Sequence, residues 1–261
     1  MPSYLIKTWI ALIAIALFGC SSENSSQETA RPLKVFAAAS LTSVMPIIAE
    51  SFQRKFPKAT LEFNFAASSL LAKQIYQGAD ADIYLSANDN WIQFLAARNR
   101  IQPDTQAAFL SNELVLITSR TAADRLKNLH DLLSMDIQRI ALADWSHVPA
   151  GIYAKAALQK AGIWEKIRGK CIPALDVRAA LTYVERGDVE CGIVYRSDAL
   201  TANKVVWTNF IGKELQPDIH YYIAIVQKST HPLNKAFHSF LFSPSARQIF
   251  NESGFVIANL D

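Results

Sequence analysis

The sequence predicts an α/β protein whose mostly parallel sheets are covered by helices. Along the chain, apolar runs of strand length alternate with segments in which apolar residues recur at the helical period, and this alternation is typical of that fold class. Apolar residues make up 51% of the 261 residues, so the chain can bury a substantial core. At about 100–200 residues per domain, the length allows one large domain or two lobes.

The predicted elements follow one another as strand, helix and strand. The first strand is expected at 33–37, and the helix after it has one apolar face, formed by Val44, Ile47, Ile48 and Phe52. Further strands are expected at 60–65, 82–85, 114–118, 139–143, 192–195, 205–207 and 221–226. Further helices are expected at 70–77, 231–242 and 246–250. Such folds bind ligands at the carboxyl ends of their strands, so functional residues are expected in the loops there.

The N-terminus predicts export. Residues 10–18 are an unbroken apolar run, which is shorter than the ~20 residues needed to span a bilayer and is typical of a signal peptide over 1–19. The residues Leu17-Phe18-Gly19-Cys20 resemble the lipobox of bacterial lipoproteins, in which the cysteine is acylated and becomes the mature N-terminus. We expect lipidation at Cys20 and a flexible polar tether over 20–32. An ordinary cleavable signal with an incidental cysteine is the alternative.

Two further cysteines, Cys171 and Cys191, lie in the exported body of the chain. Disulfides form in exported compartments, and neither thiol has the C-x-x-C spacing or the nearby histidine that would indicate metal or redox chemistry. A Cys171–Cys191 disulfide is therefore expected, and it would stabilise the fold by ~3 kcal/mol. Two separate buried thiols are the alternative.

Charge and glycine content exclude several classes of protein. The 26 Lys+Arg nearly balance the 23 Asp+Glu, giving a formal charge of +3, and no run of basic residues could neutralise a phosphate backbone. Nucleic acid is therefore not an expected partner. The nine glycines form neither a dinucleotide-binding nor a phosphate-loop pattern, so nucleotide-dependent enzymes are not expected either.

Two predicted strand ends carry serines next to a helix start. The first strand ends in Ala37-Ala38-Ala39-Ser40 and the second in Phe65-Ala66-Ala67-Ser68. A helix N-terminus attracts anions because its N–H groups are unpaired and the helix dipole is positive there. A lone serine at such a position would simply cap its helix, but the loops of neighbouring parallel strands emerge at the same edge of a sheet. We therefore expect Ser40 and Ser68 to converge on one anion site.

Three later segments also lie at a predicted helix start or strand end. Pro149 suits a first helical turn, and the small pair Ala150-Gly151 behind it lets a ligand approach the backbone. Asp176 precedes another predicted helix, and Tyr195 ends a predicted strand. Taken alone, Asp176 would be a helix cap and Tyr195 a core aromatic residue with a satisfied hydroxyl.

In order, these loops resemble those of the molybdate-binding proteins of bacterial ABC importers, which are two-lobed periplasmic binding proteins. The resemblance runs from about Leu33 to Ile257. It rests on six segments: 37–41 (AAASL), 67–69 (ASS), 81–87 (ADIYLSA), 147–153 (HVPAGIY), 176–178 (DVR) and 192–198 (GIVYRSD). The sequence departs from the family at Trp145, where proline is usual, and at Ala67, where serine is frequent.

The resemblance implies a domain organisation. Each of two lobes would be a mostly parallel sheet flanked by helices, with the ligand cleft between the lobes. Lobe 1 would comprise 33–112 and 219–261, and lobe 2 would comprise 113–218. The chain would cross between the lobes near 111–113 and 216–218.

The resemblance also implies a function. A lipoprotein on the outer side of a bacterial membrane would capture molybdate, and also tungstate, and deliver it to the membrane permease of an ABC importer. Carried over by position, the oxyanion contacts are the hydroxyls and amides of Ser40 and Ser68, the backbone amides of Ala150 and Val177, and the phenol of Tyr195. The protein is expected to be a monomer without a cofactor, a cation ligand or a catalytic residue.

Three alternatives remain open. Another oxyanion, such as sulfate or phosphate, or an organic anion would suit the same donors. An exported serine hydrolase would need a base beside its serine, but the five histidines are scattered and no serine lies in a G-x-S-x-G motif. A metal-binding or redox lipoprotein would need a histidine and cysteine cluster that the spacings do not offer.

Overall fold

The computed structural model describes residues 31–120, 122–208 and 211–258. The predicted signal peptide at 1–19, the lipidation site Cys20 and the tether as far as residue 30 lie outside the described residues. None of the helices within these ranges has the length and hydropathy needed to cross a membrane.

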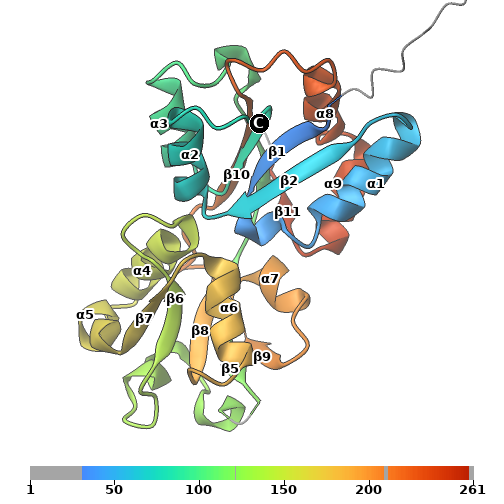
Figure 1. Cartoon of the computed structure of the whole chain (residues 1–261). Helices are drawn as coiled ribbons and strands as arrows, with labels where there is room; N and C mark the ends of the chain where they lie inside the picture. The colour runs from blue at the N-terminus through green and yellow to red at the C-terminus, as the bar shows by residue number, and fades with distance from the viewer. Residues whose placement is uncertain (1–30, 121, 209–210, 259–261) are drawn as a thin grey trace, which may run out of the picture. The chain divides into compact units, whose positions relative to one another are not determined.

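The first sheet has six strands in the order β11-β4-β10-β3-β1-β2 (Figure 1). They are β1 (Leu33–Ala38), β2 (Leu61–Ala66), β3 (Ile83–Ser86), β4 (Ala107–Ser111), β10 (His220–Ile225) and β11 (Val256–Ile257). Strand β1 runs parallel to β2 and β3, whereas β10 and β11 pair antiparallel with their neighbours. Strand β10 returns the chain to this sheet after the second sheet is complete.

Helices cover both faces of the first sheet because its strands are apolar on both sides. On one face lie α2 (Ser68–Tyr76) and α3 (Asp89–Ala96), whose Leu71 and Ile92 pack with Phe36 of β1. The other face carries α1 (Met45–Lys55), α8 (Asn234–Phe240) and α9 (Pro244–Glu252). There Phe52 of α1 meets Phe237 of α8 edge to face, with ring centroids 5.1 Å apart.

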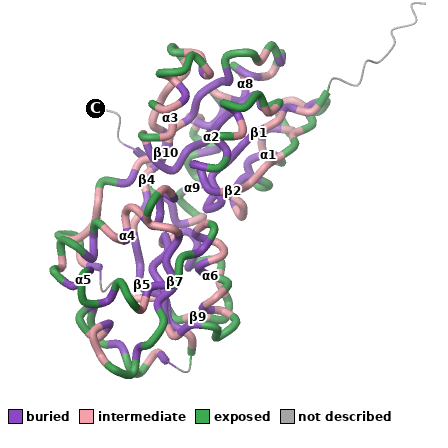
Figure 2. The backbone as a smooth tube through the Cα atoms, turned by 60° about the vertical axis from the view of Figure 1, so that its left-hand side comes forward, coloured by how far each residue is buried: buried purple, intermediate pink, exposed green. Residues whose placement is uncertain are grey.

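The second sheet has five strands in the order β7-β6-β8-β5-β9. They are β5 (Leu114–Ser119), β6 (Ile140–Ala143), β7 (Cys171–Ala174), β8 (Cys191–Tyr195) and β9 (Val205–Thr208). Helices α4 (Pro149–Lys160) and α6 (Val177–Glu185) flank it, and α5 (Trp164–Ile167) and α7 (Arg196–Leu200) are short. Five 3₁₀ turns complete the described elements: Ala39–Leu41, Pro103–Thr105, Ala123–Arg125, Leu129–Leu133 and Arg168–Lys170. In Figure 2 the strands of both sheets are mostly buried, while exposed residues follow the outer sides of the helices.

The predicted strands all form, but the sheets are mixed where the sequence favoured mostly parallel pairing. Strand β6 is parallel to β7 and β8, whereas β5 is antiparallel to β8 and β9. The periodicity missed the helices α3, α5 and α7 and the strands β4, β7 and β11. The first helix begins at Met45 and not directly after Ser40, and Ile47 on that helix is 45% exposed, so its assignment to the apolar face is wrong.

The chain crosses from the first sheet to the second between β4 and β5 and returns between β9 and β10. Gln216, on the returning segment, ties the two crossings together. Its Oε1 accepts from the backbone N–H of Leu114 over 2.8 Å, and its Nε2 donates to the Leu114 carbonyl over 2.8 Å. The Gln216 side chain thus makes the same two hydrogen bonds to the Leu114 backbone that a residue of a neighbouring strand would make.

The predicted disulfide is wrong in this structure: Cys171 and Cys191 are both buried and free. They begin strands on opposite sides of β6, and each is paired with Ile140. Two strand spacings, about 9–10 Å, therefore separate their backbones, whereas the Cα atoms of a disulfide lie within ~7 Å. Burial raises the pKa of the Cys171 thiol to about 12, which keeps it protonated and unreactive.

Candidate functional site

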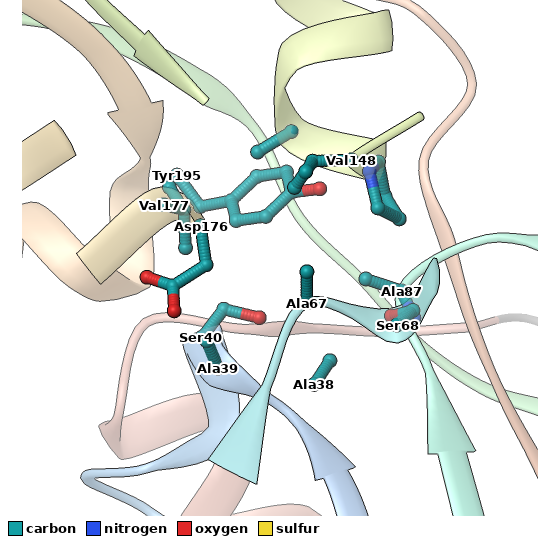
Figure 3. Close-up of a pocket in the computed structure, with 12 residues that line it drawn as sticks. Ala38, Ala39, Ser40, Ala67, Ser68, Ala87, Val148, Asp176, Val177 and Tyr195 are labelled. Carbon is teal, nitrogen blue, oxygen red and sulfur yellow. The ribbon is translucent and has the colours of Figure 1, made fainter. Parts of the chain in front are cut away.

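A small cavity lies where the carboxyl ends of strands from both sheets face each other (Figure 3). One wall follows the ends of β1, β2 and β3, and the other follows the ends of β6, β7 and β8. The lining residues are Ala38, Ala39, Ser40, Ala67, Ser68, Ala87, Val148, Pro149, Ala150, Asp176, Val177 and Tyr195. The cavity volume, measured to the centre of a water-sized sphere, is about 10 Å³. This is near the lower limit for holding one water molecule.

The structure brings all five predicted site residues to this one cavity. Ser40 and Ser68 lie on the wall of the first sheet, and Ala150, Val177 and Tyr195 lie on the wall of the second. In Figure 3, Ser40, Ala67 and Ser68 face Tyr195 and Val148 across the cavity. Residues separated by more than a hundred positions in the sequence therefore form one constellation.

Neither serine caps a helix, so the expectation that both occupy capping positions is wrong. Ser40 lies inside a 3₁₀ turn that begins after Ala38, and its Oγ is 2.9 Å from the hydroxyl of Tyr221. Ser68 is the first residue of α2, and its Oγ accepts a 3.0 Å hydrogen bond from the backbone N–H of Ala87. Ser40 is therefore held by a residue of β10 and Ser68 by the residue that follows β3, and neither is held by its own helix.

The second wall presents two helix N-termini. Helix α4 begins at Pro149, so Ala150 is in its first turn, and α6 begins at Val177. The first N–H groups of a helix have no partner within the helix and lie at the positive end of its dipole. Asp176 caps α6 as predicted, since its Oδ1 accepts from the backbone N–H of Ala179 over 2.9 Å. The amides of Ala150 and Val177 are thus suited to hold an anion.

Tyr195 differs from a core tyrosine with a satisfied hydroxyl. Its side chain is 1% exposed, and within the described part of the chain its hydroxyl makes no hydrogen bond of good geometry, although the Tyr221 hydroxyl lies close enough to raise its pKa. Burial raises the pKa of this phenol, so it stays protonated and can donate. A buried and unpartnered hydroxyl costs free energy unless something that enters the cavity accepts its hydrogen.

The sequence of this chain matches the family model of bacterial extracellular solute-binding proteins over residues 33–256. The chain belongs to this family. It is 36% identical to Molybdate-binding protein ModA of Escherichia coli (strain K12) over 259 residues, which cover 97% of this chain and 100% of the relative. It is 32% identical to the putative ABC transporter substrate-binding lipoprotein YvgL of Bacillus subtilis (strain 168), with 97% of each chain covered.

A solved structure extends the likeness to the fold. The periplasmic molybdate-binding protein of Azotobacter vinelandii superposes with a TM-score of 0.77 over 87% of this chain and 100% of that one, at 18% sequence identity. At that identity the likeness concerns the fold, and it confirms the predicted two-lobed α/β architecture of a periplasmic binding protein.

A contact that the sequence did not reveal joins the two walls of this solute-binding protein. Ser69 Oγ, on α2, lies 2.9 Å from His147 Nδ1, and Trp91 Nε1, on α3, donates to the His147 carbonyl over 3.1 Å. His147 lies two residues before the start of α4 at Pro149. No local pattern could have predicted these contacts, because the partners are 78 and 56 positions apart.

Gly151 has a structural role that the sequence suggested only in part. A Cβ at this position would lie 2.1 Å from the carbonyl oxygen of Ala143, at the end of β6. The absence of a side chain therefore lets the start of α4 pack directly on the strand, which holds the Ala150 amide at the cavity. We expected the small residue to admit a ligand, but its contact is with the protein backbone.

The remaining features of the site concern charge and metals. Among the described residues that line the cavity, none is Lys, Arg or His, and Asp176 is the acidic member. Within the described ranges, no group of three His, Cys, Asp or Glu side chains is arranged to hold a metal ion. Trp145 packs edge to face against Trp164 with ring centroids 5.4 Å apart.

Proposed function

We propose that this solute-binding protein captures molybdate, and also tungstate, between its two sheets and delivers it to the permease of an ABC importer. The observation that carries the proposal is the convergence of hydroxyls and helix N-termini from both sheets on one cavity. The relatives described as molybdate-binding proteins, among them that of E. coli at 36% identity, support the choice of cargo.

The chemistry of the donors suits a tetrahedral dianion. Such an ion needs several hydrogen-bond donors around it, and Ser40, Ser68, Tyr195 and the amides of Ala150 and Val177 supply them from two sides. Hydrogen bonds to a charged acceptor are each worth about 1.5–3 kcal/mol. Neutral dipoles bind an anion without a fixed cation, so release to a transporter remains possible.

Binding then involves movement of two lobes, which we assign to 33–112 with 219–261 and to 113–218. The cavity has room for about one water molecule, so the walls separate when an oxyanion of four oxygens enters or leaves. The two crossings, tied by Gln216, are the hinge. The contact of Ser69 with His147 forms when the lobes close.

We further propose that Cys20 anchors the chain to the outer side of a bacterial membrane, where it acts as a monomer. The lipobox-like run before Cys20 supports this anchor, and the 32% identical Bacillus subtilis relative is described as a lipoprotein. In cells that express the full chain, Cys20→Ser should move the protein from the membrane fraction to the soluble fraction. Retention of the variant in the membrane fraction would contradict lipidation.

Binding of the cargo is tested by thermal shift with molybdate, tungstate, sulfate, phosphate and chromate. A ligand that binds only the folded state stabilises it by RT ln(1 + [L]/Kd), so molybdate and tungstate should raise Tm most. A larger shift with sulfate or phosphate would assign the site to that oxyanion instead. No shift with any of the five would refute an oxyanion site.

The residues are tested by isothermal titration of molybdate. Ser40→Ala and Ser68→Ala should each weaken binding by roughly 10- to 100-fold, since each loses a hydrogen bond to a charged acceptor. Ser239→Ala, on the exposed side of α8, is the matched control and should leave Kd unchanged. Unchanged affinity in both site variants would mean that the serines do not contact the anion.

An exported serine hydrolase is the weaker candidate. Ser40 and Ser68 contact Tyr221 and a backbone N–H, neither of which is a general base at neutral pH. Ser69 does contact His147, but Ser69 is fully buried, and Asp144 Oδ2 is 3.8 Å from His147 Nε2, too far to orient the ring by a hydrogen bond. We expect no ester hydrolysis above background. Hydrolysis that is present in the wild type and lost in Ser69→Ala would favour the serine hydrolase.

A further inference from the structure

A buried hydrogen-bonded chain runs from the cavity to the first crossing between the sheets. Ser40 Oγ lies 2.9 Å from the Tyr221 hydroxyl. Asn112 Nδ2 lies 3.3 Å from the same hydroxyl and 2.8 Å from Ser197 Oγ. All four side chains are at most 5% exposed, so water does not compete for these bonds.

The contacts of Asn112 determine which way its amide faces. The backbone N–H of Glu113 donates to Asn112 Oδ1 over 2.9 Å, so this oxygen is the acceptor. The two hydrogens of the amide nitrogen are then directed at Tyr221 and Ser197. An amide N–H donates and cannot accept, and the Tyr221 oxygen therefore accepts from Asn112.

This orientation sets the direction of the bond to Ser40. The Tyr221 oxygen receives a hydrogen from Asn112, and Ser40 Oγ, 2.9 Å away, is within hydrogen-bond distance to accept the hydrogen of Tyr221. The neighbouring Tyr195 phenol, whose pKa burial and Tyr221 both raise, keeps its own hydrogen and does not need that of Tyr221. Ser40 Oγ then accepts, and the serine hydrogen is left for the cavity. The hydrogen of the Ser68 hydroxyl is also left for the cavity, because Ser68 Oγ accepts from the backbone N–H of Ala87.

We propose that Tyr221, oriented by Asn112, is a positioning residue that makes the Ser40 hydroxyl a donor toward the bound oxyanion. The inference rests on the proposed function, because it takes the anion to accept from Ser40. Neither Tyr221 nor Asn112 lines the cavity, so both act through the serine. Without the Tyr221 hydroxyl, Ser40 has no fixed donor behind it and can turn its lone pairs toward the anion.

The protonation state of Tyr221 is compatible with this role. Tyr221 is fully buried, and burial, together with the nearby Asp198 carboxyl, raises the pKa of its hydroxyl. The phenol therefore keeps its hydrogen throughout the neutral range, and the direction of the chain does not change with pH there.

A double-mutant cycle on molybdate binding tests the proposal. Tyr221→Phe should weaken binding by about 3- to 10-fold when Ser40 is present, and by less than about twofold when Ser40→Ala is already in place. A purely structural loss would weaken both backgrounds equally. Tyr222→Phe, one residue further along β10 and without a hydroxyl hydrogen bond in the described structure, is the matched control and should bind like the wild type.

The outcomes separate this inference from the proposed function. If Ser40→Ala and Ser68→Ala both leave molybdate binding unchanged, the proposed anion site fails. If Ser40→Ala alone does, the positioning role fails and the site stands. If Ser40→Ala weakens binding but Tyr221→Phe does not, or does so equally in both backgrounds, only the positioning role fails. Should Tyr221→Phe not fold, Asn112→Ala replaces it: this variant removes the donor to Tyr221, and its effect on Kd should likewise vanish in the Ser40→Ala background.

Discussion

The two walls of the cavity hold their donors in different ways. On the wall of the first sheet, the hydroxyls of Ser40 and Ser68 are tied to buried partners within the protein. On the wall of the second sheet, two donors are backbone amides at helix starts, and the Tyr195 hydroxyl has no partner in the described part of the chain. The first wall is therefore organised without a ligand, whereas the Tyr195 hydroxyl on the second is not held by a well-formed hydrogen bond and can donate to a ligand.

This difference says which changes harm the fold and which harm binding. Substitutions that displace a helix start should damage the second wall through the backbone. Removal of a tied hydroxyl should cost both stability and affinity, because a buried partner is left unpaired. Removal of the Tyr195 hydroxyl should weaken binding of the anion without lowering the stability of the fold. Four predictions, from the largest expected effect to the smallest, test this distinction.

The largest effect is expected for Gly151→Ala. The added Cβ would lie 2.1 Å from a backbone oxygen of β6, and no side-chain rotation relieves such an overlap. We expect a loss of about 4 kcal/mol or more in the free energy of unfolding, measured with urea, and weaker molybdate binding as the Ala150 amide shifts. Gly169→Ala, where a Cβ meets nothing within 4 Å, is the control. Equal stabilities of the two variants would contradict the close packing of α4 on β6.

Asp198, behind Tyr195 on α7, predicts a pH dependence of stability. Burial raises the pKa of Asp198 to about 7, although Arg178 Nη1 lies 3.3 Å from its Oδ1, whereas the unfolded value is near 3.8. Between about pH 4 and pH 7 the folded chain therefore binds more protons than the unfolded chain, and stability falls as pH rises through this window. Asp198→Asn should remove this fall, on the order of 3 kcal/mol.

The measurement for Asp198 is urea unfolding of wild type and Asp198→Asn at pH 5 and pH 8. The stability of the wild type relative to the variant should be lower at pH 8 than at pH 5. A difference that does not change with pH would show that Asp198 titrates in the folded chain as it does in the unfolded one.

Tyr195→Phe should separate affinity from stability. Within the described residues the hydroxyl makes no hydrogen bond of good geometry, so the unliganded variant should be as stable as wild type or more stable by about 1 kcal/mol, while molybdate binding weakens by up to about tenfold. Tyr84→Phe is the contrasting control, because the Tyr84 hydroxyl donates to the Ser68 carbonyl over 2.8 Å and its loss should destabilise the chain. Destabilisation by Tyr195→Phe would reveal a partner for its hydroxyl.

The smallest effect is expected for Asp176→Asn. Asparagine keeps the cap on α6 and removes a negative charge from the cavity lining, so molybdate should bind about fivefold more tightly, which corresponds to about 1 kcal/mol. Asp136→Asn, on an exposed turn, controls for the change in net charge. Weaker binding by Asp176→Asn, measured by titration, would indicate that this carboxylate assists binding instead of opposing it.

Much of the fold follows from local patterns. Apolar runs located the strands, and the N-cap at Asp176 and the start of α4 at Pro149 were predicted from residue type alone. Pairing direction was harder, since an antiparallel strand such as β5 has the same apolar pattern as a buried parallel one. The resemblance of six short loops to one family selected the five site residues that the structure brings to one cavity.

The sequence by itself determined the order of most elements, the family and five of the residues that line the cavity, because periodicity and loop motifs are properties of neighbouring positions. Only the tertiary structure decided the state of those residues. Ser40 meets Tyr221 across 181 positions and Ser68 meets Ala87 across 19, so neither serine caps a helix. The two cysteines are separated by an intervening strand, and Gly151 is required by a backbone contact. These contacts depend on which strands become neighbours, and local sequence does not encode that choice.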